Sequence, residues 1–166
     1  MSVRITVIPC IAAVWYLSAC DGSPTGPAVP ASEAEIVAVL TGSQWMRAGL
    51  SITPGFDINA DGRVITDLFA EEPACAHDDV FTMKADGTWM NDEGPTKCDV
   101  DAPQVGTGTW TLNATHDSLY TDDDSDPDPQ VAKIAVLNPS GLSLVAVSTD
   151  WPDGQARTQT FTWRAK

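Results

Sequence analysis

Short alternating runs of apolar and polar residues dominate the chain from residue 44 onward. Such runs, separated by turn residues, are typical of the strands of an all-β sandwich or barrel. Short connectors force neighbouring strands to pair antiparallel, and no long helix interrupts them to link parallel strands. The pattern therefore predicts antiparallel strands at 44–52, 63–70, 79–84, 88–92, 106–113, 117–121, 131–138, 142–149 and 156–164.

The alternation also assigns the two faces of these strands. Gly108, Trp110 and Leu112 share one side of their strand, while threonines occupy the other. Phe161 and Trp163 likewise oppose threonines and an arginine. One face of the sheet is therefore expected to be apolar and bulky, and the other to be threonine-rich and exposed to water.

The connector at Asp86 and Gly87 admits two hairpin turns. A two-residue turn would pair Met83 with Met90, whereas a three-residue turn with Gly87 in the left-handed region would pair Met83 with Trp89. We favour the three-residue turn because it brings two large apolar side chains together.

One short helix precedes the strands. Ser32 and Glu35 have the spacing of a capping box, in which each side chain bonds the backbone of the other residue. Apolar residues follow, and Gly42 provides a stop signal. The prediction is a helix over 33–41.

Residues 1–19 have the features of a secretory signal. Arg4 precedes an apolar run over 5–17 that is shorter than the about 20 residues needed to span a bilayer. The Leu-Ser-Ala-Cys sequence at 17–20 resembles the lipobox of bacterial lipoproteins. That resemblance implies cleavage before Cys20 and its acylation, with palmitate-type chains that anchor the protein. The alternative is a plain secretory signal with a coincidental cysteine.

Residues 20–31 form a Pro/Gly/Ser-rich tether that is expected to hold the folded part away from the bilayer. The predicted location is the cell envelope. Asp21 resembles the inner-membrane retention signal of enterobacteria, but other phyla do not follow that rule. We expect the outer membrane rather than the inner one, with the leaflet left open.

Length and charge limit the function classes. The chain has 166 residues, 43% of them hydrophobic, which suits one folded domain at 32–166. A formal charge of -14 repels phosphate backbones and excludes nucleic acid as a partner. The sequence has no Gly-x-Ser-x-Gly motif, no phosphate-binding glycine loop and no histidine in a nucleophile motif. We expect a monomer that is not an enzyme; an unrecognised hydrolase is the alternative.

Cys75 and Cys98 are the cysteines that remain after cleavage and lipidation. A disulfide between them is the default in an oxidising envelope and would stabilise the fold by roughly 3–3.5 kcal/mol. The rival interpretation is a metal site that adds His77 and Asp78 to the two cysteines.

Two acidic segments are candidate metal sites. Asp57, Asn59, Asp61 and Gly62 match the opening of an EF-hand-type calcium loop, but the twelfth position is Leu68, so calcium would bind weakly. A solvated turn is the alternative, and no other cofactor is expected. The second segment is a solvated connector or a weak divalent-ion site, formed by Asp122, Asp123, Asp124, Asp126 and Asp128.

Several motifs follow one another in a recognisable order. They are Cys75-x-x-Asp78-Asp79-x-Phe81-x-Met83, Asp86-Gly-Thr-Trp89, Glu93-Gly-x-x-Lys97-Cys98 and Gly108-Thr-Trp-Thr-Leu112, framed by Gly42-x-x-Trp45 and Phe161-Thr-Trp-Arg164. This succession resembles the lipocalin-like domains of Bacteroidetes-type envelope lipoproteins over about 40–166. The resemblance implies an up-and-down antiparallel β-barrel of about eight strands around an apolar pocket, and it implies no known reaction.

The inward side chains either line a ligand pocket or fill the barrel, since barrels of this size allow both outcomes. The leading hypothesis is a module that binds a small hydrophobic ligand among Met83, Trp89, Trp110, Leu112, Phe161 and Trp163. The alternative is a structural or adhesion module with a filled barrel and no small-molecule ligand.

The ends of the barrel suggest one further contact. Trp45 opens the first strand and Arg164 ends the last, and in lipocalin-like barrels these two strands meet. We expect Arg164 to stack on the Trp45 indole as a cation–π contact. The alternative places Arg164 in a frayed C-terminus.

Overall fold

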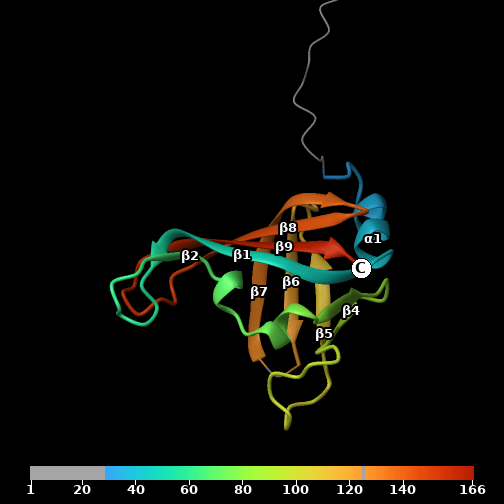
Figure 1. Cartoon of the computed structure of the whole chain (residues 1–166). Helices are drawn as coiled ribbons and strands as arrows, with labels where there is room; N and C mark the ends of the chain where they lie inside the picture. Colours follow the sequence, from blue (N-terminus) through green and yellow to red (C-terminus); the bar gives the residue numbers. More distant parts are fainter. Residues whose placement is uncertain (1–28, 125) are drawn as a thin grey trace, which may run out of the picture.

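A closed antiparallel barrel is the main feature of the computed structural model, which describes residues 29–124 and 126–166 (Figure 1). Its strands are β1 (Gln44–Phe56), β2 (Ile65–Asp67), β3 (Val80–Met83), β4 (Thr88–Asp92), β5 (Val105–Leu112), β6 (Ser118–Asp123), β7 (Asp126–Asn138), β8 (Gly141–Ser148) and β9 (Arg157–Ala165). Neighbours along the chain pair from β3 to β9, and β1 pairs with both β3 and β9, which closes an eight-stranded barrel. The predicted all-β, up-and-down architecture is confirmed.

The prediction was least accurate at 63–70. There β2 covers only three residues and is followed by two 3-10 helices, η1 (Phe69–Glu71) and η2 (Ala74–His77). The Leu68 N–H still donates to the backbone of β1, but the Ala70 N–H donates to Asp67 Oδ1 at 3.2 Å. This side-chain bond favours a helical turn over further strand pairing.

The hairpin between β3 and β4 has the predicted register, with Met83 opposite Trp89. Gly87 has a φ of +83°, which a residue with a Cβ rarely adopts. Asp86 Oδ1 accepts hydrogen bonds from the Thr88 N–H and hydroxyl, and these bonds lower the pKa of Asp86. The turn residues therefore determine which inward side chains meet.

The helix α1 (Glu33–Thr41) has the predicted bounds and the predicted capping box between Ser32 and Glu35. Ile36 and Leu40 are buried in the core. The Trp45 indole N–H donates to the Leu40 carbonyl at 2.9 Å, which joins the helix to the first turn of β1. Helix α1 thereby covers one end of the barrel.

The two ends of the barrel differ because the strands alternate in direction. The turns at 83–88, 112–118 and 138–141 lie at the end covered by α1 (Figure 1). The connections at 92–105 and 148–157 join the opposite ends of their strands, so both longer loops lie away from the end covered by α1.

The predicted inward and outward faces are confirmed. Gly108 and Trp110 are buried, and the threonines between and beside them are exposed. The core is densest toward α1 and consists of Ile36, Leu40, Trp45, Met83, Trp89, Trp110, Leu119, Ile134, Leu137, Leu142 and Leu144.

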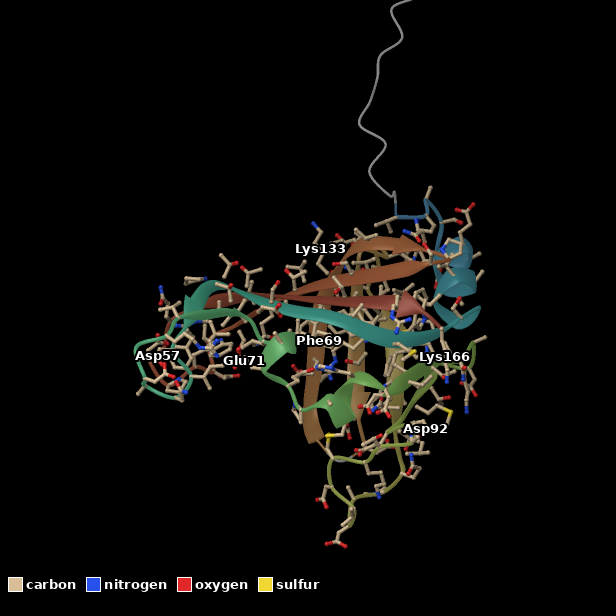
Figure 2. All side chains as sticks on the ribbon, in the orientation of Figure 1. Asp57, Phe69, Glu71, Asp92, Lys133 and Lys166 are labelled. Carbon is tan, nitrogen blue, oxygen red and sulfur yellow. A yellow bond between two sulfur atoms is a disulfide. The ribbon has the colours of Figure 1, made fainter. Side chains whose placement is uncertain are left out.

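An arm extends sideways from the barrel, built from the far halves of β1 and β9 together with β2; Figure 2 shows Asp57 at its tip. Arg157 is only 2% exposed there and makes a two-oxygen ion pair with Asp153. Its guanidinium lies 4.6 Å from the Phe56 ring centroid and 4.9 Å from that of Trp151. The ion pair lowers the pKa of Asp153 and ties the loop at 149–156 to β9.

Cys75 and Cys98 form the predicted disulfide, which links η2 to the loop after β4. Both sulfurs are used in this bond, so the rival metal site with His77 and Asp78 is wrong.

The predicted signal at 1–19 and the lipidation site Cys20 lie outside the described residues, as does most of the tether at 20–31. Among the helices that the structure describes, none has the length and apolarity needed to cross a membrane.

Candidate functional site

A cavity of about 670 Å³ lies inside the barrel, between the core and the loops at the uncovered end. We call this cavity the mouth. Its aromatic lining consists of Trp45, Phe81, Trp89, Phe161 and Trp163. Its polar lining consists of Arg47, Asp79, Asn91, Glu93, Thr107, Asp123 and Asp124. Ala102 and Pro103, from the loop that carries Cys98, complete one wall.

A second cavity of about 260 Å³ follows the inner faces of β6 to β9. We call it the side chamber. Met83, Leu119, Leu142 and Leu144 give it a mainly apolar lining at the α1 end. Four aromatic residues line both cavities: Phe81, Trp89, Phe161 and Trp163. The barrel is therefore hollow, with an aromatic group between a polar mouth and an apolar chamber.

Packing with its neighbours orients Trp89. Its indole N–H donates to the Asp122 carbonyl at 3.2 Å, and its ring centroid lies 5.3 Å from that of Phe81. A Cβ on Gly108 would approach two ring carbons of Trp89 to 2.6 Å. The absence of a side chain at Gly108 is what allows the indole to lie against β5.

Phe161 and Trp163 form the opposite aromatic pair, with stacked rings whose centroids are 5.9 Å apart. Both are only partly buried although they face into the barrel. Large inward aromatic residues of a filled barrel would be fully buried, so these two rings border open space.

The polar residues of the mouth are placed by the same alternation as the aromatic ones. Asp79 lies two positions before Phe81, Arg47 two positions after Trp45, and Asn91 two positions after Trp89. Residues two apart on a strand point to the same face. Each strand thus carries its aromatic residue deeper in the barrel and its polar residue nearer the loops.

Asp79 is a polar residue of the mouth whose hydrogen bonding is incomplete. Its Oδ2 accepts a hydrogen bond from Asn91 Nδ2 at 3.3 Å, while Oδ1 is shielded from solvent and has no hydrogen-bond partner among the described residues. Burial raises the pKa of Asp79, and the negative charges of Glu93 and Asp78 add to the effect. The Asn91 hydrogen bond and, less strongly, the charge of Arg47 oppose the shift without cancelling it.

Arg47 is the one basic residue in the lining of the mouth, and its charge is already balanced. Its Nη1 lies 2.6 Å from Glu72 Oε1. The lining also contains four carboxylates, those of Asp79, Glu93, Asp123 and Asp124. The side chains of the mouth therefore carry a net negative charge.

The predicted ligand residues divide into two groups. Met83 lines the side chamber and Trp89, Phe161 and Trp163 line both cavities, while ligand binding by these residues stays a prediction. Trp110 and Leu112 line neither of them. The Trp110 indole N–H donates to the carbonyls of Lys84 and Thr88 at 3.0 and 3.1 Å, which fixes its ring at the covered end as part of the core.

Sequence reasoning missed Phe81 and the polar lining, including Arg47, Asp79, Asn91 and Glu93. The alternation held the signal, because these residues have the same parity along their strands as Trp45 and Trp89. A search for apolar side chains passes over Arg47, Asp79, Asn91 and Glu93 because they are charged or amidic, whereas Phe81 is apolar and was assigned only to the hairpin.

The predicted stacking of Arg164 on Trp45 is wrong. Strands β1 and β9 do meet, but Trp45 lies opposite Ala165, and Arg164 lies opposite Met46. Opposed residues share a face, so Trp45 points into the core while Arg164 is exposed outside. Arg164 also pairs with Gly141 of β8, so the end of β9 is not frayed.

The predicted calcium loop at the tip of the arm is held by its own side chains. Asp57 accepts from the N–H groups of Asp61 and Gly62, at 3.1 and 2.8 Å. Asn59 Nδ2 donates to Asp61 Oδ2 at 2.9 Å, and hydrogen bonds lower the pKa of Asp61. These contacts account for a solvated turn, and calcium binding there stays a prediction.

Two aspartates of the acidic run that begins in β6 have contacts of their own. Asp124 Oδ2 accepts from the Thr107 hydroxyl at 2.6 Å, while Asp122 uses its backbone carbonyl for Trp89. Within the part of the chain that the structure describes, no group of three His, Cys, Asp or Glu side chains is placed to hold a metal ion.

Comparison with known proteins identifies no sequence relative: no protein-family model matches the chain, and no curated protein matches it. Among solved structures, the chain is similar to a lipocalin-like protein from Bacteroides uniformis, with a TM-score of 0.45 and 10% identity over 77% of this chain and 99% of that one. It is also similar to a DUF4847 family protein from Bacteroides vulgatus, with a TM-score of 0.42 and 12% identity over 75% of this chain and 95% of the other.

Proposed function

We propose that this protein is a non-catalytic envelope lipoprotein that binds a small hydrophobic or amphipathic molecule inside its barrel. The observation that carries the proposal is the hollow interior, where the mouth and the side chamber share an aromatic lining. Their volumes, about 670 and 260 Å³, fall in or near the range of about 300–1,000 Å³ typical of small-molecule sites.

The placement of the helix supports access to the site from the aqueous side. The tether that would follow Cys20 leads to Ser32, and α1 covers the end of the barrel opposite the mouth. A lipid anchor at Cys20 would therefore attach the barrel through its covered end and leave the mouth free of the attachment.

A binding role fits the surroundings of the two histidines better than catalysis does. The His77 ring stacks on Phe69 with centroids 4.1 Å apart and lines neither cavity. His116 lies 3.3 Å from Glu33, at the covered end. General acid–base chemistry in the barrel would thus have to use carboxylates alone.

The binding proposal is tested by titrating the purified protein with N-phenyl-1-naphthylamine, an uncharged fluorescent probe. We expect a saturable 1:1 increase in fluorescence. The Kd of the probe should rise at least about tenfold in Trp163→Ala, because this variant removes a wall shared by both cavities. Tyr120→Ala removes an aromatic residue from the outer face and should bind like the wild type. Absence of saturable binding would favour the structural module instead.

The anchor is tested separately with Cys20→Ala. The wild-type chain should fractionate with membranes and carry the mass of its acyl chains, and the variant should lose both properties. A variant that remains in the membrane fraction with the same added mass would contradict the lipobox assignment.

A further inference from the structure

The mouth combines features that point to the charge of its ligand. Its lining carries four carboxylates against one arginine, and that arginine is paired with Glu72 at 2.6 Å. An anionic head group entering the mouth would meet repulsion and would have to displace Glu72 to find a cationic partner. An uncharged head group would gain little from the surplus negative charge.

Asp79 adds a specific position to this general charge. Its Oδ1 is enclosed, lacks a hydrogen-bond partner among the described residues, and belongs to a side chain that lines the mouth. Because no water-sized group can reach that oxygen, neither water nor a donor compensates its charge there. A cation held beside the Asp79 side chain in the mouth would offset the charge. The Asn91 amide already occupies Oδ2, which fixes the carboxylate plane.

Aromatic faces lie where the rest of such a ligand would go. Phe81 follows Asp79 on the same face of its strand, and Trp89 and Trp163 border both cavities. Indole faces attract cations and also pack against alkyl chains. Beyond them, the side chamber offers a mainly apolar lining for a hydrocarbon tail.

We propose, building on the proposed function, that the barrel selects cationic amphiphiles: a protonated amine held beside the Asp79 carboxylate at the mouth, attached to an apolar body that lies against the aromatic group and extends into the side chamber. Glu93 strengthens the field at the mouth, and Arg47 stays with Glu72. Asp79 is the specificity-determining residue.

The test compares three probes that share a ten-carbon chain and differ in the head group: decylamine, decanol and decanoate. Isothermal titration calorimetry at pH 7, below the aggregation concentration of each probe, should give decylamine the lowest Kd, by about tenfold or more relative to decanol. Decanoate should bind more weakly than decanol. In Asp79→Asn, decylamine should lose its advantage while decanol binds as in the wild type.

Asp150→Asn is the matched control, because it removes the same charge from an exposed position outside both cavities. It should leave the order of the three probes unchanged. Circular dichroism of both variants confirms that each is folded. If Asp150→Asn weakened decylamine as much as Asp79→Asn does, the effect would come from net charge, and the assignment of Asp79 would be overturned.

The remaining outcomes separate this inference from the proposed function. If none of the probes binds, the binding function itself fails. If all three bind with similar affinity, or if Asp79→Asn keeps the preference for decylamine, the barrel binds ligands but the selection of cations is overturned.

Discussion

The partly buried position of Asp79 lowers the stability of the folded state at neutral pH. Burial raises its pKa, so the folded state disfavours the ionised carboxylate that is present at neutral pH. A cation bound beside the Asp79 carboxylate would offset that penalty, which is the behaviour expected of a residue kept for binding rather than for folding.

The first prediction concerns this penalty. Asp79→Asn should raise the free energy of unfolding at pH 7, because the variant has no charge to bury and Asn91 can still donate to it. Below the ordinary pKa of an aspartate both folded and unfolded wild type are protonated, so the difference should close as the pH falls through the raised pKa. Urea unfolding of both proteins at neutral and acid pH measures this difference in unfolding free energy. An Asp79→Asn variant that is less stable than the wild type at pH 7 would contradict a penalty from the buried charge.

Gly108 shows how one residue type shapes the site. A Cβ there would lie 2.6 Å from Trp89 ring carbons and 2.0 Å from the Asp122 carbonyl oxygen. The second prediction is that Gly108→Ala costs about 1–3 kcal/mol of unfolding free energy and changes the tryptophan emission. Gly106→Ala is the control on the same strand, since its Cβ would meet nothing within 4 Å. Equal losses in both variants would mean that steric contact with Trp89 is not the cause.

At the level of elements, local signals were sufficient where the contacts are local. The capping box of α1 and the turn at Gly87 specified their elements from neighbouring residues alone. The arm could not be predicted from local signals. Arg157 is packed between Phe56 and Trp151, and these two aromatic residues lie about 95 positions apart in the sequence. Alternation identifies the inward face of each strand. It does not show which inward residues border open space, because that depends on how the whole barrel closes. For this reason Trp110 was assigned to the ligand site from the sequence, and Phe81 was missed.

The disulfide restrains a loop that lines the mouth. Cys98 belongs to the loop that contributes Ala102 and Pro103 to the cavity wall, and Cys75 belongs to η2. The Lys97 ammonium also donates to the Val100 and Ala102 carbonyls of the same loop. Both contacts restrict the loop beside the cavity.

The third prediction is that reduction lowers the free energy of unfolding by roughly 3–3.5 kcal/mol, because the unfolded chain regains the entropy that the cross-link removes. Urea unfolding with and without dithiothreitol measures the loss. A variant with both Cys75→Ser and Cys98→Ser should match the reduced wild type and should not respond to the reductant. A reductant effect of the same size in this variant would show that the disulfide is not responsible.

At the scale of the whole molecule, the barrel has one covered end and one open end. Helix α1 and the core residues around Trp110 fill the covered end, and the polar mouth lies toward the loops of the other. The polarity of the interior therefore changes along the barrel axis, which suits a ligand with two chemically different ends. We therefore place the ligand inside the barrel, across the aromatic group that separates the mouth from the side chamber.

The most direct measurement of that position is a two-dimensional ¹H–¹⁵N spectrum of the tryptophan indole N–H groups during titration with decanol. Decanol tests the barrel interior independently of head-group charge. We expect saturable shifts for Trp89 and Trp163, which border both cavities, and an unchanged signal for Trp151 in the arm. Saturation with no shift at Trp89 and Trp163, or with shifts confined to Trp151, would place the ligand outside the barrel and contradict binding between the mouth and the side chamber.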